Sequence, residues 1–393
     1  MERYGCMINI TDKTKCCGCT ACADACPKNC ITMECDYEGF LYPKVDLDMC
    51  VECNVCERVC PQNKEIKETT VLPVTVVARD KRNDVLSIGT SGSIFTSIME
   101  HVLQKNGIVY GVVVDADRVV KHIRVDSFGD CNLTKIPCSK YVRSEIRGIF
   151  PKVKQDLQSG RFVCFSGTPC QIAGLKGYLG KDYDNLFTVD VVCHGNPSPL
   201  FWRKIAEYLE EKYRSKIIDV RFRNKTYGYH SGTMRVVFEN GKVYLASART
   251  NLFLKAFFSD LCSRPSCYNC HFKHIQHVSD LTLYDSWHAA ELANLRDDDR
   301  GYTNIIVQSK KGNAILERLH TVEKYQVDTK KAIELDGVMV ENSVEWNSRR
   351  KVFFDGIDTD DIKKHCLRFM KISCKDYFVE WAKQIYYHKK FDR

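Results

Sequence analysis

Residues 16–27 read CCGCTACADACP, and residues 50–61 read CVECNVCERVCP. Both stretches contain the pattern C-x-x-C-x-x-C-x-x-x-C-P, and an offset of 34 residues relates the cysteines of one stretch to those of the other. In this pattern three closely spaced thiolates bind one cubane cluster, and the fourth binds the other cluster before proline turns the chain away. The repeat therefore predicts two interlocked [4Fe–4S] clusters.

The interlock assigns each cysteine of the repeat to a cluster. We expect cluster one to be held by Cys16, Cys19, Cys22 and Cys60, and cluster two by Cys50, Cys53, Cys56 and Cys26. Zinc is the alternative metal, although zinc sites use paired C-x-x-C arms without this interlock. Cys17 competes with its neighbour for a ligand role, whereas Cys6, Cys30 and Cys35 lie outside the motif and are expected to be structural.

The composition of the whole chain is that of a soluble globular protein with an excess of cysteine. The 393 residues are 44% hydrophobic and 27% charged, and 22 of them are cysteines. No apolar run approaches the length of about 20 residues that spans a bilayer, and no secretory segment begins the chain, so we expect a cytoplasmic protein. The net charge of +8 is dispersed and comes with no nucleic-acid-binding motif, which argues against a nucleic-acid partner.

Charge and composition divide the chain. Residues 1–66 form a cysteine-rich module with a net charge of −4, so the remainder carries +12. Residues 67–73 are predicted to be a linker because they are polar and end in proline. Residues 74–350 alternate predicted strands with helices of about ten residues, and strand signals dominate residues 216–246, where residues 239–241 favour a hairpin turn. The predicted fold class is α+β: a small cluster-binding module followed by a mixed α/β domain.

The last segment, residues 351–393, is predicted to be a basic helical extension. Residues 363–393 contain nine Lys or Arg against three Asp or Glu. Apolar residues recur there at helical spacing, at Leu367, Met370, Cys374, Phe378, Trp381 and Ile385. This stripe fits a helix packed on its own domain, and it also fits docking to a partner or a membrane surface.

Further cysteines follow predicted strands of the main domain. Cys170 lies in the first turn of a helix that begins Thr168-Pro169, where the helix dipole favours a thiolate. Cys193 follows the next strand, and loops at the carboxyl ends of neighbouring strands meet in space. Cys267 and Cys270 form a C-x-x-C pair in a basic loop. These four thiols would suffice for a third cluster; a zinc site and inert buried thiols are the alternatives, and Cys262 is an alternate ligand.

Six motifs in the same order resemble the coenzyme F420 hydrogenase/dehydrogenase beta-subunit family. They lie at residues 92–95 (GSIF), 139–144 (SKYVRS), 165–171 (FSGTPCQ), 190–195 (DVVCHG), 264–270 (RPSCYNC) and 279–287 (SDLTLYDSW). The N-terminal module is similar to a bacterial two-cluster ferredoxin fused to that family. The resemblance extends over about residues 1–290.

The resemblance implies cofactors and sites. Members of the family bind FAD and a [4Fe–4S] cluster in the main domain, which supports a third cluster at Cys170, Cys193, Cys267 and Cys270. It assigns a flavin site to Thr90, Ser91, Gly92, Lys140, Tyr141 and Ser144. Near the flavin, His194 and Asp285 are candidate catalytic proton donors, although a lone histidine is more often a structural residue.

Three functions are compatible with this sequence. The leading hypothesis is a ferredoxin-linked flavo-iron–sulfur reductase that passes electrons from the clusters through FAD to a small organic substrate. An enzyme that oxidises or reduces coenzyme F420 is the alternative within the family. A non-catalytic subunit that hands electrons to another protein is the alternative of a different class. The expected partners are ferredoxin or another electron-transfer protein.

Overall fold

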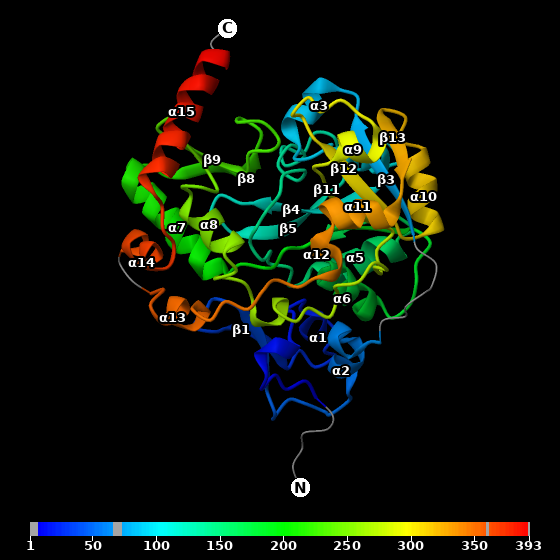
Figure 1. The fold of residues 1–393 in the computed structure, drawn as a ribbon. Helices are drawn as coiled ribbons and strands as arrows, with labels where there is room; N and C mark the ends of the chain where they lie inside the picture. Colours follow the sequence, from blue (N-terminus) through cyan, green and yellow to red (C-terminus); the bar gives the residue numbers. More distant parts are fainter. Residues whose placement is uncertain (1–6, 66–72, 359–360, 392–393) are drawn as a thin grey trace.

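The computed structural model describes residues 7–65, 73–358 and 361–391, so the predicted linker at residues 67–73 lies almost entirely outside the described residues. Figure 1 shows the small N-terminal module at the bottom of a larger body, with the C-terminal helix projecting from the opposite end. The mixed α/β character predicted from the sequence is confirmed.

The module is built on one antiparallel hairpin flanked by very short helices. Strand β1 pairs with β2, and a short helix follows Cys19 and another follows Cys53, within each cysteine motif. The elements are η1 (Lys13–Lys15), α1 (Ala21–Asp24), β1 (Ile31–Cys35), β2 (Leu41–Val45), α2 (Val55–Val59) and η2 (Pro61–Asn63). The interior is small and consists mainly of thiols with a few aliphatic side chains such as Ile8, Ile31 and Met33. A core of this size supplies little stability by itself, so bound metal would add to it.

An eight-stranded mixed sheet forms the centre of the main domain. Its order is β13-β3-β12-β11-β7-β6-β4-β5, and the run β11-β7-β6-β4 is parallel while the outer strands pair antiparallel. The strands are β3 (Val74–Asp80), β4 (Ile108–Val114), β5 (Val120–Val125), β6 (Val163–Gly167), β7 (Leu186–Val191), β11 (Leu281–Ser286), β12 (Tyr302–Val307) and β13 (Val322–Val327). The carboxyl ends of β6 and β7 therefore lie side by side, as the sequence predicted.

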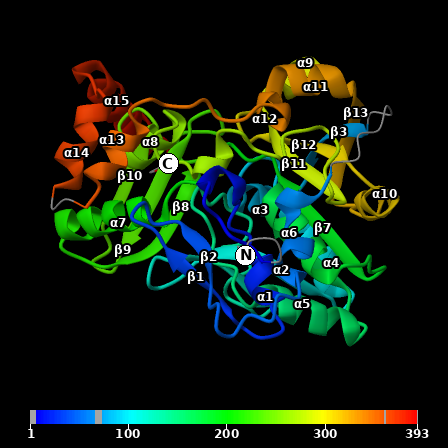
Figure 2. The same ribbon diagram turned by 90° about the horizontal axis from the view of Figure 1, so that it is seen from below.

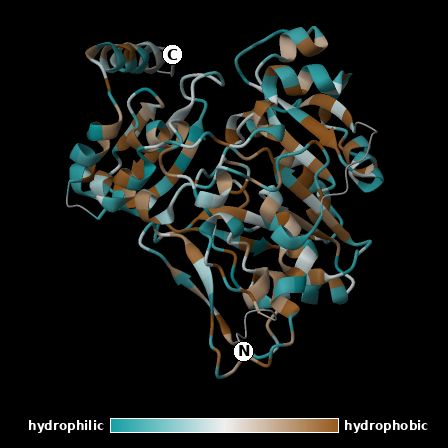
Figure 3. Ribbon diagram, turned by 60° about the horizontal axis from the view of Figure 1, so that its bottom comes forward, coloured by the Kyte–Doolittle hydropathy of each residue, from teal (hydrophilic) through white to brown (hydrophobic). Residues whose placement is uncertain are grey.

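Helices cover both faces of this sheet. On one face α4 (Ile94–Gln104) and α10 (Lys310–Glu317) pack on side chains such as Val109 and Val189. On the other face α5 (Ile149–Gln158) and α6 (Pro169–Leu179) pack on side chains such as Tyr110 and Phe165. Successive side chains of β4 point to opposite faces of the sheet. Helices cover both faces, so both sets of side chains are apolar and the strand is a continuous apolar run. In Figure 3, strands of the sheet carry brown, hydrophobic residues.

A second lobe surrounds the three-stranded sheet β10-β9-β8. Its strands are β8 (Ile217–Asn224), β9 (Thr233–Phe238) and β10 (Val243–Ser247), and its helices are α7 (Pro199–Tyr213), α8 (Leu252–Phe258), α13 (Arg350–Asp355) and α14 (Ile362–Phe369). The predicted turn at residues 239–241 joins β9 to β10, and Gly241 has a φ of +79° there. Phe353 and Phe354 of α13 are buried in the core of this lobe.

The remaining elements lie at the margins of the two lobes. They are α3 (Asn83–Ile88), η3 (Pro265–Cys267), α9 (Ala289–Ala293), α11 (Thr329–Asp336), α12 (Val338–Glu341) and α15 (Cys374–Phe391). The predicted C-terminal stripe is divided between α14 and α15. Met370 is buried, whereas Phe378 and Trp381 of α15 are 64% and 56% exposed. None of the helices in the described ranges is long and apolar enough to cross a membrane.

Candidate iron–sulfur and cofactor site

The four cysteines assigned to cluster two line one small pocket of the module. Cys26, Cys50, Cys53 and Cys56 face it, and the backbone N–H of Ile8 donates to Cys56 Sγ at 3.3 Å. Backbone donors of this kind stabilise thiolate sulfur. A fifth thiol, Cys30, also lines the pocket, and its Sγ lies 3.3 Å from that of Cys26. The position of Cys30 in this pocket was not predicted, because Cys30 lies outside the repeated motif.

The cysteines assigned to cluster one lie where the module contacts the main domain. Cys22 and Cys60 pack in one buried cluster, and burial raises the pKa of the Cys60 thiol to about 11. Buried thiols bind metal only as thiolates, so a cationic cluster would offset this cost. From the main domain, the buried Arg264 donates to the carbonyl oxygen of Cys16 at 2.7 Å and to its Sγ at 3.4 Å.

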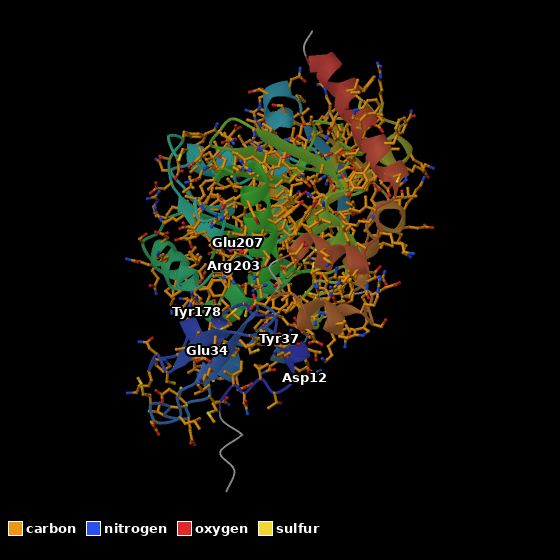
Figure 4. The ribbon with its side chains drawn as sticks, turned by 90° about the vertical axis from the view of Figure 1, so that its left-hand side faces the viewer. Asp12, Glu34, Tyr37, Tyr178, Arg203 and Glu207 are labelled. Atoms are coloured by element: carbon orange, nitrogen blue, oxygen red, sulfur yellow. The ribbon has the colours of Figure 1, made fainter. Side chains whose placement is uncertain are left out.

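Arginines of the main domain fasten the module in place. Arg350 of α13 makes a bidentate, buried ion pair with Glu38, with N–O distances of 2.8 and 2.6 Å. Arg264 and Arg350 are cations of the basic main domain that bind groups of the acidic module. Such attraction is expected from the opposite net charges of the two parts. Figure 2, viewed from below, shows the module lying across both lobes of the main domain. Figure 4 shows Glu34 and Tyr37 of the module below Arg203 and Glu207 of α7.

The four main-domain cysteines predicted to share a site line one pocket. Cys170 is the second residue of α6, which follows β6; Cys193 follows β7, Cys267 ends η3, and Cys270 follows it. Cys17 of the module lines the same pocket, so five thiols face it. Within the described chain, no three His, Cys, Asp or Glu side chains converge as closely as a single metal ion requires. The cysteines of a cubane each bind a different iron, so their sulfurs need not meet at one point.

Donors and positive charge surround these sulfurs. Arg143 donates to Cys170 Sγ at 3.5 Å, and the backbone N–H of Asn196 donates to Cys267 Sγ at 3.4 Å. The ammonium group of Lys273 donates to the carbonyl oxygen of Cys193 at 2.5 Å and lowers the pKa of that buried thiol, although burial, the larger effect, raises it. This environment suits thiolates bound to a cluster, so the donor set fits a [4Fe–4S] group.

The start of α6 fixes Cys170. Pro169 occupies the first helical position, and the side chain of Gln171 reaches back to accept from the backbone N–H of Thr168 at 3.0 Å. The hydroxyl of Thr168 lies 3.2 Å from Cys170 Sγ. The capping residues that the sequence contains therefore hold the thiol at the positive end of the helix.

A much larger cavity of about 640 Å³ adjoins the cysteine pocket. It lies between the eight-stranded sheet and the second lobe, with Leu283 on one side and Phe222 on the other. Cys193 and His194 line both the cavity and the cysteine pocket. A volume of this size, with mainly apolar walls and a few polar groups, is typical of a site for a cofactor or substrate.

Five of the six residues assigned to a flavin line this cavity: Thr90, Ser91, Lys140, Tyr141 and Ser144. Gly92 lies behind the wall, where its backbone N–H donates to the hydroxyl of Thr303 at 2.8 Å. A Cβ atom at Gly92 would stand 2.4 Å from the carbonyl oxygen of Ala78. Gly92 therefore lets the loop that carries Ser91 pack against the sheet.

Buried hydrogen bonds hold the polar side chains of the cavity. Ser144 Oγ lies 3.1 Å from His122 Nδ1 and accepts from Gln171 Nε2 at 2.8 Å. The Lys140 ammonium group donates to the carbonyl oxygen of Ile136 at 3.0 Å, and burial lowers its pKa to about 8. A cation with a lowered pKa in a cavity is a common feature of functional sites.

The two predicted proton donors both face the cavity, in different surroundings. His194 Nε2 lies 2.9 Å from Asp260 Oδ1, and burial, only partly opposed by this carboxylate, lowers the pKa of the imidazole. Asp285 accepts from Arg223 and from the hydroxyl of Tyr229 at 3.1 Å. With both carboxylate oxygens engaged, Asp285 is placed to orient Arg223 against Trp287, whose ring centre lies 4.5 Å from the guanidinium carbon.

Two cysteines outside the predicted ligand set line the cysteine pockets, and the alternate ligand lies elsewhere. Cys17 and Cys30 line cysteine pockets, although only the adjacency of Cys17 to a motif cysteine pointed to it. Cys262, the alternate ligand, is buried in the core of the second lobe and does not line the pocket.

Two family models match separate parts of the chain. Residues 160–333 match the family model for the C-terminal part of the coenzyme F420 hydrogenase/dehydrogenase beta subunit. Residues 15–64 match the model of a 4Fe-4S dicluster domain. The predicted resemblance is thereby confirmed, and the chain is an iron–sulfur protein of the electron-transferring, oxidoreductase type.

A search of curated proteins found no significant match. Among solved structures, a chain from the xenon-derivatised F420-reducing [NiFe] hydrogenase complex of Methanosarcina barkeri is 19% identical to this chain. The match covers 77% of this chain and 93% of that chain, with a TM-score of 0.43.

Proposed function

We propose that this chain, whose residues 160–333 match the model of the F420 hydrogenase/dehydrogenase beta-subunit family, is an iron–sulfur flavoprotein oxidoreductase. Electrons would pass from the module through a third [4Fe–4S] cluster to FAD and on to a small organic substrate. One observation carries the proposal: the five-cysteine pocket and the 640 Å³ cavity share Cys193 and His194 as a common wall. A cluster and a flavin on opposite sides of this wall would be close enough to exchange electrons.

The residues of the cavity fit a flavin. Bound FAD would supply the conversion between one-electron transfer and two-electron substrate chemistry. Thr90, Ser91 and Ser144 offer hydroxyl groups for polar parts of the cofactor, and Lys140 offers a buried positive charge. Tyr141 stacks on Phe257 with ring centres 5.0 Å apart and presents an aromatic wall. The proposed ligands of the third cluster are Cys170, Cys193, Cys267 and Cys270.

Electrons would reach the chain through cluster two. Cys53 is exposed, whereas Cys22 and Cys60 of cluster one are buried, so cluster two is the one nearer to solvent. Leu47, Met49 and Val51 are each more than half exposed beside its motif. These apolar side chains are suited to a transient contact with ferredoxin or another electron-transfer protein.

His194 is the better placed of the two candidate proton donors. Its ring lies on the shared wall, and Asp260 fixes the imidazole by a hydrogen bond to Nε2. Burial lowers the pKa of the imidazole and so favours its neutral form, in which the single N–H on Nε2 donates to Asp260; Nδ1 would have to take up a proton before the ring could donate one to a substrate. The positively charged Arg223 and the ring of Trp287 would contact a substrate in the same cavity.

Anaerobic reconstitution and flavin titration test the proposal. Reconstituted wild-type protein should contain about twelve irons per chain and should bind FAD. Reduced ferredoxin should then reduce the bound flavin, which is measured as a loss of flavin absorbance. Cys170→Ala should lower the iron content to about eight, leave the module signals intact and slow flavin reduction. Protein that contains eight irons before substitution, or that fails to bind FAD, would contradict the proposal.

The second candidate function is a non-catalytic electron-transfer subunit. It is favoured by the exposed aromatic side chains Phe378 and Trp381 on α15, a surface suited to another protein. Turnover separates the two functions: a protein of this kind would reduce dyes but no organic substrate without its partner. Including coenzyme F420 among the substrates tests the alternative within the family.

A further inference from the structure

Helix α6 contacts both the cluster one cysteines and the main-domain pocket. Cys170 and Gly174 are four residues apart and so lie on the same helical face. A Cβ atom at Gly174 would stand 2.7 Å from Cys19 Cβ and 3.0 Å from Cys19 Sγ. One turn further along, a Cβ atom at Gly177 would stand 2.3 Å from the carbonyl oxygen of Val59. Glycine at these positions therefore allows the module to approach the helix that carries Cys170.

Cys17 occupies the space between the two cysteine sites. It is 6% exposed and packs in the same core cluster as Cys19 and Cys170. Its thiol therefore lies among the buried side chains between Cys19 of the module and Cys170 of the main domain. It also lines the main-domain pocket, although it belongs to the module.

Arg143 holds the loop of Cys17 against Cys170. One guanidinium nitrogen donates to the carbonyl oxygen of Gly18 at 2.5 Å, and another donates to Cys170 Sγ at 3.5 Å. Gly18 has a φ of +68°, and a Cβ atom there would stand 2.8 Å from a nitrogen of Arg264. Two arginines and a left-handed glycine thus fix the loop, which limits the freedom of the Cys17 side chain.

We propose that Cys17 is a non-coordinating thiol that connects cluster one to the main-domain cluster through the sequence Cys19 Sγ, Cys17 Sγ and Cys170 Sγ. This inference rests on the proposed third cluster. A [4Fe–4S] cluster binds four cysteines, and the proposed four are Cys170, Cys193, Cys267 and Cys270, so Cys17 is the fifth thiol of the pocket and is not needed as a ligand. Cys17 is a positioning residue for electron transfer.

The step is a transfer of one electron within the protein. The reduced cluster one returns to its oxidised form, and the main-domain cluster is reduced by the same electron. No bond is made or broken, and the proton of Cys17 stays on its sulfur. The S–H group donates to one of two ligand sulfurs, and hydrogen bonds to ligand sulfur stabilise the more negative, reduced cluster.

Variants of Cys17 test the role in the reconstituted full chain. Cys17→Ala should retain about twelve irons per chain and should slow reduction of the main-domain cluster, after rapid mixing with a reduced viologen, by tenfold or more. In a redox titration followed by EPR, at least one of the two clusters should become harder to reduce. A tenfold change in its reduction equilibrium corresponds to about 59 mV for one electron. Cys17→Ser, which keeps a donor, should restore part of both quantities.

The matched control is Cys35→Ala, which removes an exposed thiol of the same module. It should change neither the rate nor either potential. If Cys17→Ala lowers the iron content to about eight, Cys17 is a ligand and the proposal is wrong. If iron, rate and potentials all match those of the wild type, the connection does not run through Cys17. Wild-type protein with only eight irons would instead contradict the proposed function.

Discussion

The module and the main domain both gather five cysteines around a pocket, and they do so in different ways. In the module, Cys26, Cys30, Cys50, Cys53 and Cys56 come from 31 consecutive residues. In the main domain, four cysteines come from helix α6, helix η3 and two loops between residues 170 and 270, and the fifth comes from the module. Local spacing creates the first pocket, whereas the order of strands in a sheet creates the second. Metal loss should therefore affect the two regions unequally.

Removal of a motif cysteine from each half of the repeat should produce the largest effect. Cys16→Ala combined with Cys50→Ala should abolish both module clusters, so that iron falls from about twelve to about four per chain. The main-domain cluster should survive because its cysteines are held by a sheet with its own apolar core. Iron and acid-labile sulfide analysis, together with EPR of the dithionite-reduced protein, measures the outcome.

The amount of iron that remains can also contradict this prediction. If more than four irons remain, the assignment of Cys16 and Cys50 as ligands is wrong. If all iron is lost, the main-domain pocket depends on the module for its structure, and the contrast between the regions fails. Zinc in place of iron and sulfide would contradict both cluster assignments. Cys35→Ala serves again as the control, with an unchanged iron content.

The ion pair between Glu38 and Arg350 tests how tightly the two regions are joined. Both side chains are about 5% exposed, and Arg350 also donates to the carbonyl oxygen of Ser263 at 2.9 and 3.0 Å. Arg350→Met would leave a buried carboxylate without its partner, and such a change costs about 3–5 kcal/mol of unfolding free energy. Urea unfolding of the reconstituted protein, followed by tryptophan fluorescence, measures the loss.

Two further variants sharpen this result. Arg203→Met removes an exposed arginine of α7 and should change the free energy by no more than about 0.5 kcal/mol. Adding Glu38→Gln to Arg350→Met removes the unpaired charge and should recover part of the loss. A single Arg350→Met variant as stable as the wild type would mean that the module is held mainly by other contacts.

The sequence predicted much of the fold because hydrophobic periodicity and capping residues agree with each other there. The predicted alternation of strands and helices is present, for example in β4 and α6, and the predicted turn at residues 239–241 joins β9 to β10. The C-terminal stripe was less informative, because helical spacing continues through residues 370–373, where the structure has a break between α14 and α15. Spacing alone does not reveal such a break when no proline or glycine marks it.

The candidate site was only partly readable from sequence. The carboxyl ends of adjacent parallel strands pointed correctly to a common location for Cys170 and Cys193. The place of Cys17 was not readable, because it depends on how the module docks against α6, and that contact is set by glycines about 150 residues away. Asp285 was predicted without its partner Arg223, which lies on a strand of the other lobe.

A change in pH should produce the smallest effect, and it should arise in the main domain. His122 lies between Ser144 and the carbonyl oxygen of Ser166 and stacks on Phe165. Burial lowers its pKa from the usual 6.5 to about 4. Between these two values the unfolded chain binds a proton that the folded chain does not. The stability contributed by the neutral imidazole is therefore complete above pH 6.5 and is lost as the pH falls towards 4.

The loss should amount to about 2 kcal/mol between pH 7 and pH 5, since one proton changes stability by about 1.4 kcal/mol per pH unit within this interval. His122→Gln should unfold with a weaker pH dependence, whereas His320→Gln, which alters an exposed histidine, should keep that of the wild type. His274, whose pKa burial also lowers to about 4, should retain a comparable share in both variants. Equal pH dependence in wild type and His122→Gln would contradict the prediction, because it would mean that His122 is protonated in the folded protein. A neutral His122 would then not be what positions Ser144 beside the cavity.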